Sequence, residues 1–119
     1  MKKLFLIFVF TLSLFSYDEL TIDDFDSKIK GKNAIIDFYA PWCPPCKILA
    51  VNLEDFEIEK PEDVEIFKVN IDNELVLAKK YGVKKLPTLL LFKDGKQIKE
   101  YVGIKSKDQL LEISQNDFK

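Results

Sequence analysis

Histidine and arginine are both absent from this chain of 119 residues, so all of its 18 basic side chains are lysines. Without histidine there is no imidazole for acid–base catalysis and no His-ligated metal centre. The 20 acidic residues outnumber the lysines and give a formal net charge of −2, so the chain lacks the basic surface that nucleic-acid binding requires. Any group that titrates near neutral pH must therefore be a perturbed cysteine, carboxylate or amine.

Cysteine is scarce, because Cys43 and Cys46 are the only two in the sequence. Two cysteines without histidine do not supply the four ligands of a structural zinc site within one chain. We therefore expect no metal and no bound cofactor. An iron–sulfur or zinc centre assembled across a dimer stays open as an alternative.

Long apolar runs and flexible linkers are also missing, and the length is that of a single domain. The apolar stretch from Leu4 to Phe15 is short against the roughly 20 residues of a membrane-spanning helix. It follows Lys2 and Lys3 and leads to Ser16, an order typical of a secretory signal peptide. We expect residues 1–16 to be removed, leaving a domain at 17–119 that is exported to a periplasmic or other extracytoplasmic space. The alternative is an uncleaved anchor.

The sequence Trp42-Cys43-Pro44-Pro45-Cys46 follows a strongly apolar segment at residues 34–39. A C-x-x-C motif between the end of a strand and the start of a helix is redox-active more often than it is a structural disulfide. Unpaired N–H groups and the positive end of the helix dipole favour a thiolate there, so we expect a lowered pKa for Cys43 and a nucleophilic role. The alternative is a structural disulfide, which closes too short a loop to stabilise the chain much.

Hydrophobic periodicity and turn residues divide the rest of the chain into alternating helices and strands. The third helix is expected to carry Leu75, Ala78 and Tyr81 and to be capped by Asp72 or Asn73. Helices are predicted at 23–30, from Pro44 to about Lys60, from residue 72 or 73 to Gly82, and after a Ser106–Gln109 capping box, and strands at 33–39, 64–70, 88–93 and, after an Asp94-Gly95 turn, 97–102. This order predicts an α/β fold with a mixed central sheet flanked by about four helices.

With these residues placed, residues 18 to 115 resemble the thioredoxin family, and the likeness extends well beyond the two cysteines. It is carried by Asp37 six positions before Cys43, by Lys68 with Asn70, Ile71 and Asp72, by Tyr81-Gly82-Val83 with Leu86-Pro87-Thr88, by residues 89–95, and by Val102-Gly103 followed by Ser106. The resemblance implies a thioredoxin fold in a single domain.

The resemblance also implies roles for two charged residues. Asp37 is expected to lie beneath Cys46 and to take or relay the proton of that thiol, while Lys68 holds Asp37 by charge. The apolar neighbours of Asp37 point to a desolvated carboxylate with a raised pKa. The alternatives are an aspartate at a solvated strand edge and an ordinary strand lysine.

A substrate groove is the third implication of the resemblance. Pro87 matches the family's cis-proline, which brings the backbone before it beside the active site, where it pairs with an extended substrate strand. Trp42, Pro44 and Leu86 are expected to contact the substrate, and Gly103 and Ile104 to floor the groove. The alternatives are a trans-proline at an edge strand and a packing role for Trp42.

Four positions depart from the family pattern. Pro44 stands where thioredoxins usually have glycine, and Val51 where they have a helix-kinking proline. Lys85 stands where a small residue is common, and Tyr39 where a tryptophan is frequent. Pro44 and Pro45 remove two N–H donors near the Cys43 sulfur, which stabilises its thiolate less and favours a reductant.

The sequence therefore predicts a monomeric thiol–disulfide oxidoreductase that reduces or exchanges disulfides of protein substrates through a Cys43/Cys46 couple. In an oxidising compartment such a reductant needs recharging, and the resemblance implies a membrane thiol-transfer partner. Two alternatives stay open. One is a disulfide-donating oxidase, and the other is a redox-silent binding module or chaperone that uses the groove alone.

Overall fold

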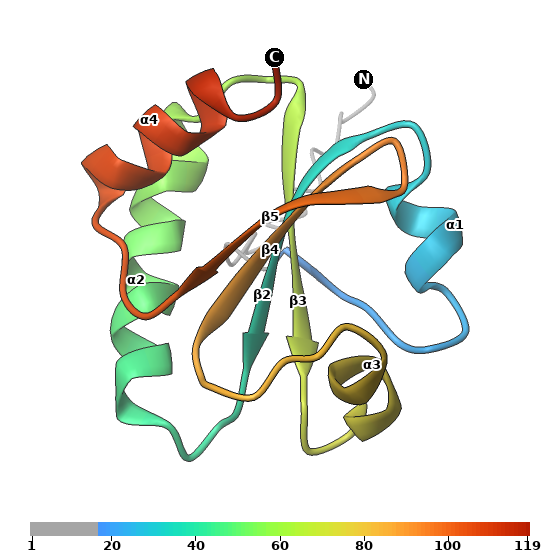
Figure 1. The fold of residues 1–119 in the computed structure, drawn as a ribbon. Coiled ribbons are helices and arrows are strands. Elements are labelled where there is room, and N and C mark those ends of the chain that lie inside the picture. Colours follow the sequence, from blue (N-terminus) through green and yellow to red (C-terminus); the bar gives the residue numbers. More distant parts are fainter. Residues whose placement is uncertain (1–16) are drawn as a thin grey trace, which may run out of the picture.

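The computed structural model describes residues 17–119, so the expected signal peptide at residues 1–16 lies outside the described residues. A five-stranded mixed sheet in the order β1-β3-β2-β4-β5 forms the centre, with helices on both faces (Figure 1). In chain order the elements are β1 (Asp18–Glu19), α1 (Phe25–Ile29), β2 (Asn33–Tyr39), α2 (Pro44–Glu59), β3 (Val64–Asn70), α3 (Leu75–Lys80), β4 (Thr88–Lys93), β5 (Lys96–Val102) and α4 (Lys107–Asn116). The predicted α/β fold with a mixed sheet is confirmed.

The central strand β2 is apolar on both faces because helices cover both of them. Figure 1 shows α2 and α4 together on one side of the sheet and α1 and α3 on the other. Ile35 packs with Leu49, Leu53 and other residues of the α2–α4 side, whereas Ile36 packs into the opposite layer with residues such as Phe25. A strand buried in this way shows no polar alternation, as its sequence indicated.

Parallel and antiparallel pairing meet at β2. It runs parallel to β3, with Asp37 opposite Lys68, and antiparallel to β4, with Asp37 opposite Leu89. Side chains in register lie on the same face of a sheet. The register therefore puts a carboxylate in the middle of the sheet with a lysine on the adjacent strand.

Two local motifs appear as predicted. Asp94 and Gly95 both have positive φ, at 51° and 82°, which is the requirement of the tight turn joining β4 to β5. Ser106 accepts a hydrogen bond from the Gln109 backbone N–H, while the Gln109 side chain accepts from the Ser106 N–H. This capping box fixes the start of α4.

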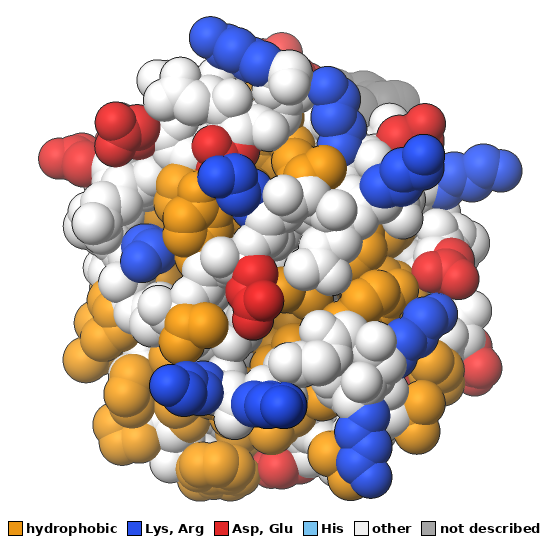
Figure 2. All heavy atoms as spheres, in the orientation of Figure 1, with side chains coloured by type: hydrophobic (Ala, Val, Ile, Leu, Met, Phe, Trp, Pro, Cys, Tyr) orange, Lys and Arg blue, Asp and Glu red, His pale blue; other side chains and the backbone are white. Residues whose placement is uncertain are grey.

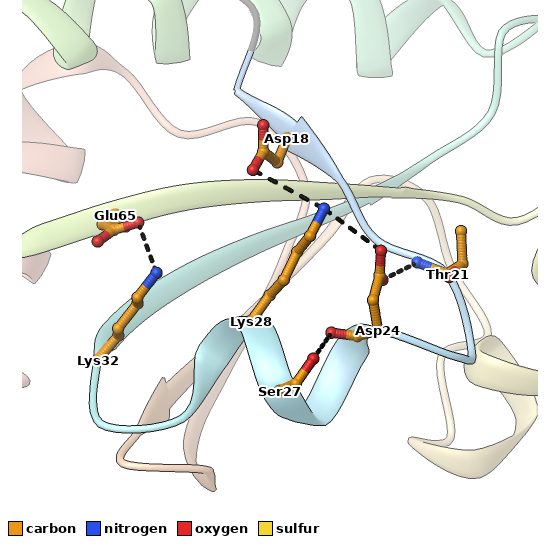
Figure 3. Close-up of polar contacts among 7 residues, drawn as sticks. All are labelled: Asp18, Thr21, Asp24, Ser27, Lys28, Lys32 and Glu65. Carbon is orange, nitrogen blue, oxygen red and sulfur yellow. Dashed lines mark hydrogen bonds and ion pairs between the residues drawn. The ribbon is translucent and has the colours of Figure 1, made fainter.

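The short helix α1 is held by polar contacts at its start (Figure 3). The Thr21 N–H donates to the Asp24 carboxylate at 2.7 Å, and Lys28 forms an ion pair with Asp24 at 3.3 Å. A second ion pair, between Lys32 and Glu65 at 3.4 Å, joins the loop after α1 to β3. These contacts fix a five-residue helix that is too short to be stable alone.

The start of α3 differs from the prediction. The helix begins at Leu75 after Glu74, and neither Asp72 nor Asn73 caps it. The reason is a turn built on Asn70. Its side chain accepts a hydrogen bond from the Asp72 N–H, and its backbone carbonyl accepts from the N–H groups of Asn73 and Glu74. Leu75 is 54% exposed, while Leu77 and Ala78 enter the core in its place.

Within residues 17–119, no helix is both long and apolar enough to cross a membrane.

Candidate active site

Cys43 and Cys46 lie at the start of α2 and are joined by a disulfide, with their Cα atoms 5.3 Å apart. Cys43 is the N-cap residue in an extended conformation, and its sulfur accepts the Cys46 N–H at 3.3 Å. Pro44 and Pro45 fill the first two helical positions and carry no N–H. The Cys46 amide is thus the first N–H of the helix that is available to the Cys43 sulfur.

The outer side of the disulfide opens on a hollow of about 390 Å³. Its lining residues are Trp42, Cys43, Pro44, Pro45, Ile71, Val83, Lys84 and Leu86. We call this hollow the outer groove. On the face drawn in Figure 2, hydrophobic side chains gather along the lower edge, toward the start of α2 and α3, with basic side chains among them. The groove thus offers an apolar surface beside one sulfur.

Trp42 is 66% exposed, which is unusual for such a large apolar side chain. Its indole N–H donates to the Asp72 carboxylate at 3.1 Å, so the ring is held at the rim of the outer groove. This placement excludes a core-packing role for Trp42.

The Leu86–Pro87 peptide bond is cis, as the resemblance implied. The Gly103 N–H donates to the Pro87 carbonyl at 2.9 Å, which brings the end of β5 next to this loop. Leu86 lines the outer groove, whereas Gly103 and Ile104 do not line it, and Ile104 is 41% exposed. The structure therefore gathers Trp42, Pro44 and Leu86 into one surface. Gly103 reaches only the loop at Pro87, and neither it nor Ile104 forms the floor that the sequence predicted.

The inner side of the disulfide faces a second hollow, of about 200 Å³, between α2 and the sheet. Its lining residues are Tyr17, Asp37, Tyr39, Ala40, Pro41, Cys46, Lys47, Ala50, Glu54 and Lys68. We call it the inner cavity. The structure thus brings together Cys46, Asp37 and Lys68, three residues that are far apart in the sequence.

Asp37 is only 2% exposed, and its Oδ1 atom has no hydrogen-bond partner among residues 17–119. Burial raises the pKa of Asp37 from its ordinary value of 3.8 to about 7, and the positive charge of Lys68 lowers it in part. The solvated-edge alternative is excluded. A carboxyl group that titrates near neutral pH beside a thiol is suited to proton transfer.

Several residues that line the inner cavity or the outer groove were not predicted from the sequence. Ala50 and Glu54 follow Cys46 at intervals of four residues on α2, so helical spacing was the signal that would have found them. Tyr17 precedes the first strand, and nothing local connects it with Asp37. Ile71 and Val83 reach the outer groove from loops whose paths the sequence does not fix.

The disulfide lies at the start of a helix that follows the central strand of a mixed sheet, and a buried carboxylate lies beneath it. This arrangement defines a dithiol–disulfide exchange centre. The fold and this centre describe the class of protein.

The comparison with known proteins gives the family. The thioredoxin family model matches residues 16–116, and the chain belongs to the thioredoxin family. A thioredoxin of Chlamydia caviae is 46% identical over 94 residues, which is 79% of this chain and 91% of that protein. A thioredoxin of Staphylococcus aureus strain Mu50 is 38% identical over 95 residues, covering 80% of this chain and 91% of its own length. The thioredoxin fold is confirmed, and the chain is a thioredoxin-like protein-disulfide reductase.

Proposed function

We propose that the protein acts in its compartment mainly as a reductant or isomerase-type exchanger of protein disulfides, with Cys43 as the attacking thiolate and Cys46 as the resolving thiol. One observation carries the assignment of the two sulfurs. Cys43 lines the outer groove, where a substrate chain has access, whereas Cys46 lines the inner cavity with Asp37.

The exchange takes two steps. The Cys43 thiolate attacks one sulfur of a substrate disulfide, a mixed disulfide forms, and the other substrate sulfur leaves as a thiolate that takes up a proton. The Cys46 thiol then passes its proton to ionised Asp37 and attacks the Cys43 sulfur. The second substrate thiolate leaves, and the Cys43–Cys46 bridge remains. Two electrons have passed to the substrate.

The substrate chain is proposed to lie across the outer groove. Trp42, Pro44 and Leu86 supply apolar contacts there. The backbone before Pro87 pairs with the extended substrate, as in other strand-addition complexes. Gly103 lies next to that segment through its hydrogen bond to the Pro87 carbonyl, and Ile104 follows Gly103 in the chain.

The donors at the Cys43 sulfur support the reducing direction. A thiolate at a helix start is stabilised by N–H groups of the first turn. Neither Pro44 nor Pro45 carries an N–H, so of the donors at the second and third helical positions only the Cys46 N–H remains. A less stabilised thiolate makes the dithiol form a stronger reductant.

The compartment and the partner complete the proposal. The order of basic, apolar and small polar residues at 1–16 supports export, with residues 17–119 as the working domain. An exported reductant needs two electrons per turnover, and we assign their supply to a membrane protein that presents a dithiol. The domain works as a monomer.

The decisive experiment separates the two cysteines. Cys46→Ser is expected to accumulate mixed disulfides on Cys43 when it is mixed with a disulfide protein such as insulin, because the resolving thiol is missing. Cys43→Ser is the matched control and should neither form adducts nor reduce insulin. A protein that reduces no insulin even when unchanged, and whose partner binding survives Cys43→Ser, would instead fit a redox-silent binding module.

A second measurement tests the direction. The dithiol–disulfide equilibrium of the protein against glutathione gives its reduction potential. A potential near that of cytosolic thioredoxins, about −270 mV, is the expected result. A value near the −120 mV of strong periplasmic oxidants would make the protein a disulfide donor.

A further inference from the structure

Lys68 lies in a row of charged residues that crosses three strands. Its register partners are Glu19 on β1 and Asp37 on β2. Residues in register point to the same face of a sheet, so all three side chains lie on one face. The lysine therefore stands between an exposed carboxylate and a buried one.

Two tyrosine rings flank the Lys68 ammonium. Its Nζ atom is 5.6 Å from the centroid of the Tyr17 ring and 5.8 Å from that of the Tyr39 ring. A cation at this distance over an aromatic face is attracted by the quadrupole of the ring. Both rings also line the inner cavity, so the contact lies beside Asp37. The two rings restrict an ammonium that the flexible lysine stem otherwise leaves free to move.

The carboxylates near Lys68 on the neighbouring strands form no ion pair with its ammonium. The Tyr39 hydroxyl donates a hydrogen bond to the carboxylate of Glu19, the register partner of Lys68 on β1. Among residues 17–119, Lys68 itself forms no ion pair. The contacts that the structure gives its ammonium are those with the two tyrosine rings.

Helix α2 adds three more charged groups on this side. Lys47 and Glu54 line the inner cavity, and Glu57 acts on Tyr17 electrostatically. Burial is the largest cause of the raised pKa of Tyr17, followed by the charges of Asp37, Glu54 and Glu57, so its ring is neutral at physiological pH. An ammonium released from the rings would be drawn toward the carboxylates of α2.

We propose that Tyr17 and Tyr39 are positioning residues that hold the Lys68 ammonium at the inner cavity, where its charge acts on Asp37 while Cys46 loses its proton. The catalytic part of this inference rests on the proposed function, in which Cys46 is the resolving thiol. The positioning part concerns the geometry of the oxidised protein alone. The resemblance to thioredoxins implied Lys68 and Asp37 but neither ring.

The test compares Tyr17→Leu with Tyr17→Phe in the whole oxidised protein. Leucine removes the aromatic face, whereas phenylalanine keeps it and removes only the hydroxyl. With the ammonium released, Asp37 is expected to titrate about half a pH unit higher in Tyr17→Leu, measured by the ¹³C NMR shift of its carboxyl group. Tyr17→Phe should titrate as the unchanged protein does.

Tyr39→Leu is the second variant, for the case that Tyr17→Leu does not fold. It removes the other ring and releases Glu19, so the Asp37 midpoint should again rise. Tyr101→Leu is the matched control, because Lys105 lies 5.6 Å from the Tyr101 ring in a similar pair that is not part of the inner cavity. It should leave the Asp37 titration unchanged.

A kinetic readout ties the rings to the reaction. The rate at which a mixed disulfide on Cys43 resolves should rise with pH through the Asp37 midpoint. In Tyr17→Leu this pH–rate profile should shift to higher pH together with that midpoint. An unchanged Asp37 midpoint in both leucine variants would overturn the proposal, as would an equal shift in Tyr17→Phe. A shifted midpoint with an unmoved profile would refute the catalytic link. Failure of the proposed function would show separately, as insulin reduction that persists in Cys43→Ser.

Discussion

Asp37 owes its chemistry to its neighbours. The same side chain at a solvated strand end titrates near 4, but between α2 and the sheet it titrates near neutral pH, at about 7. Its apolar flanks on β2 made the desolvation predictable from the sequence, because a strand buried on both faces leaves no wet side for an aspartate. The flanks did not reveal that Oδ1 lacks a partner.

A raised carboxyl pKa makes stability depend on pH. Between the unfolded pKa of 3.8 and the folded value of about 7, the unfolded chain gives up this proton while the folded protein keeps it. Stability from this group therefore falls as pH rises through that window and is lowest above it. At about 1.4 kcal/mol per pKa unit, ionised Asp37 costs the folded protein about 4 kcal/mol.

Asp37→Asn removes that cost. In urea unfolding of the oxidised protein, the variant is expected to gain about 4 kcal/mol relative to the unchanged protein on going from pH 4 to pH 8. Asp24→Asn is a suitable control, because the pKa of Asp24 is lowered by the Thr21 N–H and its stability effect has the opposite sign. A stability difference for Asp37→Asn that is the same at both pH values would show that the carboxyl group is not desolvated.

At the scale of elements, the N-terminus of α2 carries the redox chemistry. An N-cap side chain accepts hydrogen bonds from the second or third helical N–H. Here Pro45 holds the second position and Cys46 the third, so the sulfur receives one of two bonds. The sequence defined this arrangement completely, because the order of cap, proline, proline and cysteine is local.

Pro45→Ala restores the missing N–H. The new donor should stabilise the Cys43 thiolate by about 1.5 kcal/mol, the value of a hydrogen bond to a charged group. The reduction potential is then expected to rise by about 30 mV, measured by equilibration with glutathione. Pro44→Ala is the matched control, because the first helical N–H does not reach the cap side chain and the potential should stay the same. Equal shifts in both variants would show that chain stiffness, and not the donor, sets the potential.

Element boundaries were predictable where a local signal was strong. The bounds of β2, β3 and β4 agree with the sequence prediction, because these short, largely apolar segments are bounded by turn residues. The start of α3 was missed because a turn on Asn70 takes up the N–H groups that precede the helix. The Asn70 side chain accepts the Asp72 N–H, and the Asn70 carbonyl accepts those of Asn73 and Glu74. Short polar side chains can form either a cap or such a turn.

For the whole molecule, stability rests on two apolar layers on either side of the sheet. Leu53 is fully buried in the layer beneath α2 and α4, whereas Ile58 on the same helix is 68% exposed. Leu53→Ala is expected to cost about 3–4 kcal/mol in urea unfolding, through lost burial and the cavity left behind. Ile58→Ala, the matched control on α2, should cost less than about 0.5 kcal/mol. Similar losses in both would contradict the assigned face of the helix.

The sequence by itself determined the redox pair, its place at a helix start, the two prolines that limit its donors and the order of strands and helices after β1. These depend on residues close together in the chain, where spacing and turn chemistry decide the structure. Only the tertiary structure decided that Lys68 meets Tyr17 and Tyr39, that Tyr17 shares a cavity with Cys46 and Asp37, and that Gly103 lies beside Pro87. Such neighbours follow from strand register and helix packing, and the free energies that set them are summed over the whole core.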